Sequence, residues 1–314
     1  MQTRALGPLR VGAIGLGCMP MHWAYRGAPS EDDPAAVIDA ALALGVTLFD
    51  TADVYGPHAN ESLVGRALEA RRDDVTIATK VGFVVGPNGG YPLTHDARPE
   101  HIRASIDEQL RRLRTDHVDL YYLHRVDPAV PLEESWGAMA EQVAAGKARH
   151  LGTSEVTVEQ LDRARAIHPV AAVQSELSLW TRNRLADVVP WCARHGAGFV
   201  PYAPLGRGFL TGAITQASFD HDDFRASNPR FTPEAVAANQ AIVERVRGVA
   251  ERLVATPAQV ALAWTLSRGD HVVPIPGTRR LAHVRSNAGA ASLKLGADDL
   301  TALDALPDAT GDRY

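Results

Sequence analysis

The stretch Phe49-Asp50-Thr51-Ala52-Asp53-Val54-Tyr55-Gly56 follows a short apolar run, residues 46–49. A short apolar run bounded by polar residues is typical of a buried strand. Asp50 then ends the strand, and Tyr55 lies in the loop after it. Alone, this pair is a weak signal, because Asp50 fits a turn cap and Tyr55 a loop aromatic. It gains weight because polar residues end almost every later strand.

Strand and helix patterns alternate along the whole chain. The expected strands are residues 11–17, 46–49, 75–79, 118–123, 151–153, 170–173, 198–201 and 271–274, each followed by a helix. Strands that are apolar throughout are typical of a parallel sheet covered by helices. Eight such units predict an α/β fold, a single (β/α)8 TIM barrel over residues 1–314, with an N-terminal β-hairpin and additional helices.

A doubly wound sheet is the alternative architecture. It would need a glycine fingerprint between a strand and a helix. Gly12, Gly15 and Gly17 have a different spacing, and no helix opens directly after them. The irregular residues 203–231 are too long for a plain loop and predict a functional lid instead of a domain boundary.

Helix starts are predicted by polar residues that cap free backbone N–H groups. Ser30 is expected to cap the first helix, and Asn60 with Glu61 to open the second. Thr157 and Gln160 have the spacing of a capping box.

Composition excludes several classes of protein. The formal net charge is −5 without a block of like charges, which argues against binding to nucleic acid or an acidic membrane. Cys18 and Cys192 have no metal-ligand or disulfide-framework spacing. No secretion signal or membrane-length apolar run is present. We expect a cytoplasmic protein with reduced thiols, no metal and a small-molecule partner; its oligomeric state is left open.

The C-terminal strand ends carry the candidate site. They supply Asp50, Lys80, His124, Ser154, Gln174 and Tyr202. In a barrel these ends meet on one face, which is where the sites of such proteins lie. Singly, each residue also fits an ordinary surface or strand-end role; together, they predict a site.

Asp50, Tyr55, Lys80 and His124 form a plausible acid–base group. A tyrosine has an ordinary pKa of ~10, and a neighbouring ammonium is expected to lower it. Asp50 would hold Lys80 in place, and His124 would donate a hydrogen bond to a carbonyl oxygen. Proton delivery to a carbonyl without an acyl or metal intermediate indicates reduction by hydride.

Hydride transfer requires a donor, and the chain offers groups suited to a nicotinamide. Tyr202 would stack on its ring, and Ser154 and Gln174 would bind its carboxamide. The turn Pro276-Gly277-Thr278-Arg279 opens a helix, whose N-terminus favours a phosphate. Arg279 or Arg280 would pair with a 2′-phosphate and select NADPH. An ordinary capped helix with two solvated arginines is the competing interpretation.

The chain resembles the aldo-keto reductase family along nearly its full length, most closely a microbial and plant branch related to pyridoxal reductase and perakine reductase. Five motifs carry the resemblance: Phe49 to Gly56, Tyr122-Leu123-His124-Arg125, Gly152-Thr153-Ser154-Glu155, Tyr202 to Gly208, and Ile275-Pro276-Gly277-Thr278-Arg279. It implies an NADP(H)-linked carbonyl reductase with Tyr55 as the acid. The cofactor residues that it implies are Ser154, Gln174, Tyr202, Pro204, Leu205, Gly206, Arg207, Gly208, Gly277, Thr278, Arg279, His283 and Asn287.

Three positions depart from the family pattern. Glu155 replaces the usual asparagine and cannot donate to a carboxamide oxygen. His283 stands where many members have an arginine for the 2′-phosphate. Leu177 replaces a frequent tyrosine, which leaves the substrate side more apolar. Met21, Trp23 and Trp180 are candidates for lining that side, and simple loop packing explains them equally well.

Two other functions stay open. The same scaffold resembles nucleotide-sensing regulatory subunits of channels. The same residues would also serve an NAD(P)-dependent alcohol dehydrogenase, since the reaction is reversible. The segment Gly206-Arg207-Gly208 and the residues up to Phe231 are expected to close over the cofactor's pyrophosphate.

Overall fold

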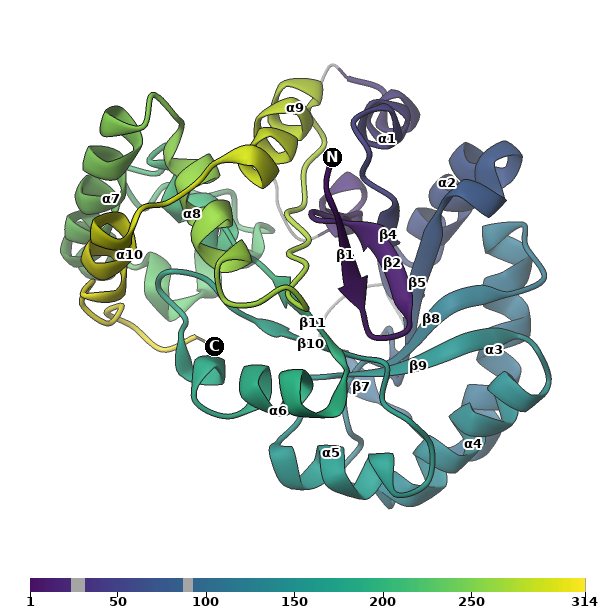
Figure 1. The fold of residues 1–314 in the computed structure, drawn as a ribbon. Helices are drawn as coiled ribbons and strands as arrows, with labels where there is room; N and C mark the ends of the chain where they lie inside the picture. Colours follow the sequence, from purple (N-terminus) through teal and green to yellow (C-terminus); the bar gives the residue numbers. More distant parts are fainter. Residues whose placement is uncertain (24–31, 87–92, 314) are drawn as a thin grey trace.

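The parallel sheet at the centre of the molecule has seven strands. The computed structural model describes residues 1–23, 32–86 and 93–313. The strands follow one another around the sheet as β3 (Leu16–Gly17), β4 (Leu48–Asp50), β5 (Thr76–Val81), β8 (Val118–Leu123), β9 (Ala148–Ser154), β10 (Ala172–Glu176) and β11 (Gly198–Tyr202). The helices lie around the outside of these strands (Figure 1). The predicted α/β barrel is therefore confirmed.

The barrel closes through residues 272–277, which form bridges instead of the predicted eighth strand. Parallel bridges join Phe199 to Val272 and Gly17 to Gly277. Backbone bonds of 2.9 to 3.0 Å link residues 273 and 275 to β11, and residue 274 to Gly15. Proline has no N–H to donate, so Pro274 and Pro276 prevent a continuous ladder.

The predicted first strand, residues 11–17, is divided between two structures. β1 (Thr3–Leu6) and β2 (Leu9–Gly12) form an antiparallel hairpin, and only β3 joins the barrel. Leu6 and Val11 are fully buried against the barrel interior. A Cβ on Gly198, the first residue of β11, would meet Leu6 at 2.2 Å. The hairpin therefore plugs the N-terminal end of the barrel, and the opposite face is left for a site.

The helices largely follow the predicted pattern. They are α1 (Pro34–Ala43), α2 (Ala59–Leu68), α3 (Pro99–Leu113), α4 (Leu132–Ala144), α5 (Val158–Arg165), α6 (Val188–His195), α7 (Pro233–Arg252), α8 (Pro257–Leu266), α9 (Leu281–Gly289) and α10 (Ala297–Asp304). The sequence prediction lacks α8, although its start repeats the capping box found at α5, with Thr256 and Gln259 in place of Thr157 and Gln160. Ser30 lies outside the described residues; the observed cap of α1 is Asp33.

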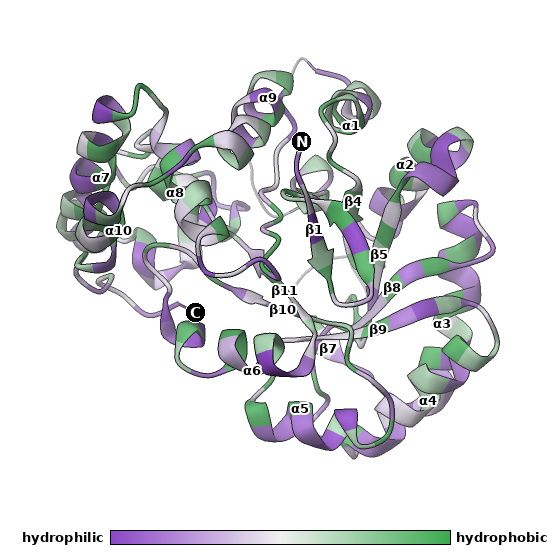
Figure 2. Cartoon of the chain, viewed as in Figure 1, coloured by the Kyte–Doolittle hydropathy of each residue, from purple (hydrophilic) through white to green (hydrophobic). Residues whose placement is uncertain are grey.

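The remaining elements are short. These are the hairpin of β6 (Phe83–Val84) and β7 (Thr94–His95), and the 3-10 helices η1 (Met19–Met21), η2 (Glu69–Asp74), η3 (Asn183–Leu185), η4 (Gly206–Thr211), η5 (Phe224–Ser227), η6 (Pro229–Phe231) and η7 (Ala290–Ser292). The helices carry both hydrophobic and hydrophilic residues around their surfaces (Figure 2). In α3, Ile102, Ile106 and Leu110 face the core. Within the described part of the chain, no helix is long and apolar enough to cross a membrane.

Candidate active site

Five strand ends bring polar side chains to one face of the barrel. Asp50 is the last residue of β4, Ser154 of β9 and Tyr202 of β11. Lys80 is the penultimate residue of β5, and His124 directly follows β8. Register places these positions side by side, since Gly17 pairs with Asp50, and Asp50 with Ala78. The parallel strands thus gather the predicted residues as the sequence pattern requires.

Lys80 is the centre of the acid–base group. Its side chain is fully buried, and Nζ donates to Asp50 Oδ1 at 2.5 Å, to the Thr51 carbonyl at 2.7 Å and to Tyr55 Oη at 3.3 Å. Three acceptors satisfy the three donors of an ammonium. The predicted contacts of Lys80 with Asp50 and Tyr55 are therefore present in the structure.

Tyr55 and His124 lie beside each other above Lys80. Their ring centroids are 6.1 Å apart, with an edge-to-face angle of 85°. Tyr55 is 7 % exposed and His124 is 8 % exposed, so both reach solvent only through the site. Among the residues described, none bonds to the buried His124 Nδ1. Nε2 is therefore the ring atom that can reach a substrate.

Burial dominates the electrostatics of this group. It raises the pKa of Tyr55 above its ordinary value, and the ammonium of Lys80 offsets only part of that increase. The expectation of a lowered Tyr55 pKa is thus not met in this structure, which holds no ligand. Burial opposes the charge of Lys80, but Asp50 and Tyr55 together raise its pKa. Burial, then Lys80 and Arg125, lower the pKa of His124 well below its usual range, so its imidazole is neutral at pH 7.

Asn60 and Glu61 support the site from behind instead of opening α2 as solvent-facing caps. Both are fully buried in the first turn of that helix. Asn60 accepts from Thr51 Oγ1 at 2.7 Å and donates to the Cys18 carbonyl at 2.9 Å. Glu61 accepts from Thr79 Oγ1 at 2.6 Å. These bonds fix the backbone on both sides of Asp50 and Lys80, a role that the sequence analysis missed.

Ser154 and Gln174 have protein partners at the place expected for a carboxamide. Gln174 Nε2 donates to Asp50 Oδ2 at 2.7 Å. Ser154 Oγ accepts from Arg125 Nη1 at 2.9 Å. Tyr202 ends β11 and is partly exposed. Each of the three stands on the face of Tyr55, and Gln174 is tied directly to the acid–base group.

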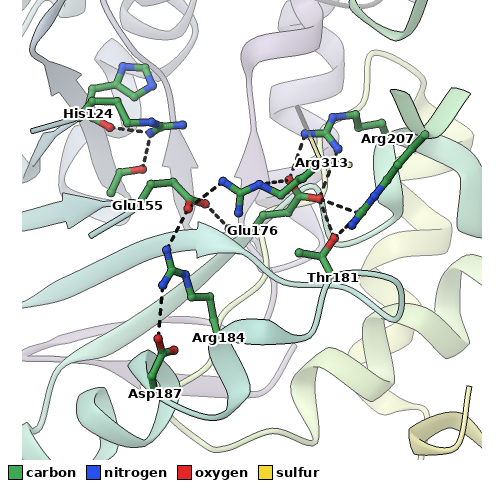
Figure 3. Close-up of polar contacts among 11 residues, drawn as sticks. His124, Glu155, Glu176, Thr181, Arg184, Asp187, Arg207 and Arg313 are labelled. Atoms are coloured by element: carbon green, nitrogen blue, oxygen red, sulfur yellow. Dashed lines mark hydrogen bonds and ion pairs between the residues drawn. The ribbon is translucent and has the colours of Figure 1, made fainter. Parts of the chain in front are cut away.

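Glu155 is held away from a carboxamide by its own ion pairs. Its carboxylate accepts from the Glu176 backbone N–H at 2.8 Å and pairs with Arg313 at 2.9 Å and Arg184 at 3.4 Å. Figure 3 shows Arg184 and Arg313 on Glu155, with Arg313 also reaching Glu176. Glu155 also has a positive φ of 54°, which turns the chain sharply after β9. The departure at this position therefore has a structural explanation.

The predicted lid segment is anchored by a buried ion pair. Arg207 Nη2 lies 3.0 Å from Glu176 Oε2, and both side chains are almost fully buried. Gly206, Arg207 and Gly208 have successive positive φ values of 57°, 55° and 96°. That backbone is unfavourable for an arginine, so the ion pair holds the segment in a conformation it would otherwise leave. Pro204 and Leu205 lead into this turn.

The phosphate turn is also formed as a compact unit. A Cβ on Gly277 would meet Pro20 at 2.7 Å, so only glycine fits there. Thr278 Oγ1 accepts from the Arg280 N–H at 3.1 Å and lies 3.4 Å from His283 Nδ1. Arg279 precedes α9, whose buried face carries Asn287. The sequence analysis missed Asp32, whose Oδ2 accepts from the Leu281 N–H at the start of α9.

Of the three substrate candidates, the structure brings only Trp23 to Tyr55, with ring centroids 5.7 Å apart. Met21 packs into the main core. Trp180 is 3 % exposed and stacks on Phe209 of η4 at 4.6 Å, so it supports the lid segment and does not face Tyr55. The aromatic group around Tyr55 includes Phe83, a residue that the sequence analysis missed.

Comparison with known proteins identifies the family. The sequence pattern described as "Aldo/keto reductase family" matches residues 13–308. A soybean (Glycine max) protein described as probable aldo-keto reductase 1 is 43 % identical over 309 residues, which cover 97 % of this chain and 88 % of that protein. The chain therefore belongs to the aldo/keto reductase family, and this membership supports an oxidoreductase of the carbonyl-reductase type.

Solved structures agree with this assignment. The glycerol dehydrogenase AKR11B4 of Gluconobacter oxydans is 31 % identical and superposes with a TM-score of 0.87, covering 96 % of this chain and 94 % of its own. The aldo-keto reductase AKR11C1 of Bacillus halodurans, solved in its holo form, is 25 % identical with a TM-score of 0.79. That comparison covers 100 % of this chain and 98 % of the other.

Proposed function

We propose that this chain is an NADPH-dependent reductase that converts an aldehyde or ketone to an alcohol, with Tyr55 as the general acid. The observation that carries the proposal is the buried series Asp50–Lys80–Tyr55, joined by bonds of 2.5 and 3.3 Å. A fully buried lysine that bonds a tyrosine hydroxyl is costly unless that contact has a use. We take residues 1–314 as one catalytic domain.

The chain's own residues supply the proton chemistry. A bound nicotinamide would deliver hydride to the carbonyl carbon. Tyr55 Oη then gives its proton to the carbonyl oxygen, and the adjacent Lys80 ammonium stabilises the phenolate that forms. The neutral His124 donates a hydrogen bond to the same oxygen and orients it. Positioned acid catalysis of this kind contributes ~10²–10⁴-fold. Burial raises the Tyr55 pKa, so the phenol keeps its proton until charge develops beside Lys80.

The residues present fit a nicotinamide dinucleotide. Ser154, Gln174 and Tyr202 would hold the nicotinamide, and residues 204–208 would lie over the pyrophosphate. Gly277, Thr278 and Arg279 would bind the adenosine phosphate at the start of α9, with His283 and Asn287 behind them. The holo form of the Bacillus relative supports a cofactor on this scaffold. Both cysteines are buried free thiols, which suits a reducing cytoplasm.

Tyr55→Phe is the direct test of this proposal. It removes one hydroxyl, and we expect turnover of any accepted aldehyde to fall at least ~10³-fold while NADPH affinity stays within about twofold. Affinity is measured by quenching of tryptophan fluorescence. Tyr121→Phe is the control, because Tyr121 is also buried and its hydroxyl bonds Gln109, which contacts only the backbone carbonyl of Lys80 and not its ammonium. Retained turnover in Tyr55→Phe would remove Tyr55 as the acid.

A second candidate is alcohol oxidation. The structural relative from Gluconobacter is named a glycerol dehydrogenase, and microscopic reversibility lets the same residues run both ways. Initial rates with NADP⁺ plus alcohol against NADPH plus carbonyl, at matched pH, separate the two directions. A purely nucleotide-sensing role is disfavoured, since sensing alone gives no use for Tyr55 bonded to Lys80.

A further inference from the structure

Arg125 directly follows His124, and among the described residues only one of its guanidinium nitrogens donates hydrogen bonds. Nη1 donates to the His124 carbonyl at 2.6 Å and to Ser154 Oγ at 2.9 Å. The side chain is partly buried. These two bonds fix the guanidinium on the site face at the level of His124. The Arg125 side chain therefore loses little further conformational freedom when it binds a ligand.

The opposite edge of the guanidinium, Nε and Nη2, has no acceptor within residues 1–23, 32–86 and 93–313. Nor does any carboxylate of those residues pair with Arg125. The same edge binds carboxylates elsewhere in this chain. Arg103 holds Glu141 through Nε at 2.7 Å and Nη2 at 2.9 Å. Arg163 holds Glu133 through the same pair of atoms at 2.8 and 2.9 Å. A planar fork of this kind matches two carboxylate oxygens.

The surroundings place Arg125 among the groups that would receive a substrate. Its guanidinium carbon lies 5.8 Å from the Phe83 ring centroid, and that ring lies 4.9 Å from the ring of His124. Burial and then Lys80 lower the pKa of His124, and the nearby charge of Arg125 lowers it further. The nearby carboxylate of Glu155 is already paired with Arg313.

Building on the proposed function, we propose that the substrate is a carbonyl compound that carries a carboxylate, bound by the free edge of Arg125. Its carbonyl would lie at Tyr55 and His124. Its body would be apolar or aromatic, since Trp23 and Phe83 line this part of the site. Arg125 is then a specificity residue, whose charge selects an anion and whose position sets the distance from carbonyl to carboxylate.

The kinetic test compares two aldehydes of the same shape, 4-carboxybenzaldehyde and the neutral 4-nitrobenzaldehyde. Loss of a charge-assisted fork should lower kcat/KM for the carboxylate about 10- to 100-fold in Arg125→Met, mainly through KM, and change the nitro compound by less than about threefold. Arg125→Lys should recover part of the loss. Arg103→Met is the control for removing a surface arginine. An equal fall with both aldehydes would make Arg125 only an anchor of His124 and Ser154, and would overturn the proposal.

A binding experiment separates this proposal from the proposed activity. Benzoate is titrated calorimetrically into wild type and Arg125→Met, each alone and with saturating NADP⁺, after circular dichroism shows that both are folded. We expect at least about tenfold weaker benzoate binding by the variant. If wild type reduces neither aldehyde yet shows this difference, the reductase proposal fails and the carboxylate site stands. Equal benzoate binding overturns the site. Weaker NADP⁺ binding with unchanged benzoate affinity would also overturn it and assign Arg125 to the cofactor.

Discussion

Gln174 donates a 2.7 Å hydrogen bond to Asp50, from β10 across the barrel to β4. Lys80 occupies the other carboxylate oxygen, so both oxygens of this buried acid have a donor. The bond joins a residue predicted for the cofactor to the acid–base group. If Gln174 moves to bind a carboxamide, its hydrogen bond to Asp50 therefore changes as well.

We expect Gln174→Leu to impair turnover as well as stability. Burial raises the pKa of Asp50, and Lys80 and Gln174 both oppose that increase, so losing Gln174 raises it further. We predict about tenfold lower kcat and a loss of ~1–3 kcal/mol in the free energy of unfolding. Stopped-flow turnover and urea unfolding measure the two. Gln142→Leu is the control, since the buried Gln142 side chain donates to Ala138 in its own helix, away from the site. An unchanged kcat in Gln174→Leu would show that the bond to Asp50 has no catalytic effect.

Lys80→Met should abolish turnover and leave Asp50 as a buried charge without its cation. Removing one partner of a buried pair costs ~3–5 kcal/mol, because the remaining charge is uncompensated. The double variant Asp50→Asn/Lys80→Met removes both charges and should recover much of that stability without recovering activity. Urea denaturation and aldehyde turnover of the wild type and these two variants test this split. Recovery of activity in the double variant would mean that the charge of Lys80 is not needed.

The barrel could be predicted because its strands are short and apolar and its helix caps are local. The C-terminal ends of barrel strands meet on one face, which allowed Asp50, Lys80 and His124 to be predicted there. The barrel closure could not be predicted from the apolar pattern. Pro274 and Pro276 fit that pattern, but they lack the N–H groups that a continuous strand ladder needs. Nor could the split of residues 11–17, where glycines permit both a strand and a turn.

The supporting residues of the site were missed for a related reason. Asn60 and Glu61 have the composition of a helix start, and only tertiary packing makes them buried partners of Thr51 and Thr79. Arg313 and Glu155 are far apart in the sequence, and no local pattern predicts such a contact. The sequence leaves Trp180 open between a pocket wall and loop packing, and its stacking on Phe209 favours packing.

Glu176→Gln should loosen the segment that carries Arg207. The carboxylate of Glu176 binds Arg207 and Thr181 and lies 3.6 Å from Arg313, so the substitution removes the carboxylate that pairs with the buried Arg207. Limited trypsin digestion should then cut after Arg207 about tenfold faster, because a left-handed arginine no longer held relaxes to other conformations. Glu133→Gln, which breaks only an exposed pair with Arg163, is the control. Identical digestion of both variants would show that Glu176 does not hold this segment in place. Slower cutting of the wild type with NADPH would support the lid.

Cofactor selectivity should depend on Asp32 and His283 in opposite directions. The carboxylate of Asp32 accepts from the first N–H of α9, where a 2′-phosphate is expected, so it competes with the phosphate for the helix N-terminus and repels it. Burial, then Arg280, lowers the pKa of His283, so the imidazole is neutral at pH 7 and adds no charge. We therefore expect Asp32→Asn and His283→Arg each to raise the ratio of NADPH to NADH affinity about 3- to 10-fold. Asp39→Asn on the exposed face of α1 is the control in fluorescence titrations. An unchanged ratio in both variants would place the phosphate elsewhere.

The stability of the protein should depend on pH through His124. Burial, Lys80 and Arg125 hold the pKa of His124 well below the value of ~6.5 expected in the unfolded chain. Between these two values the unfolded state binds more protons, so the free energy of unfolding rises with pH and levels off above about pH 6.5. His124→Asn removes the contribution of His124 to this pH dependence, and we expect the slope between pH 5 and 6.5 to fall by up to ~1.4 kcal/mol per pH unit.

Urea unfolding at steps of half a pH unit measures the slope. His168→Asn is the comparison, because His168 is only partly buried and its pKa is lowered by burial alone; its slope should change less. An equal change in both variants would mean that the site around His124 exerts no special charge effect.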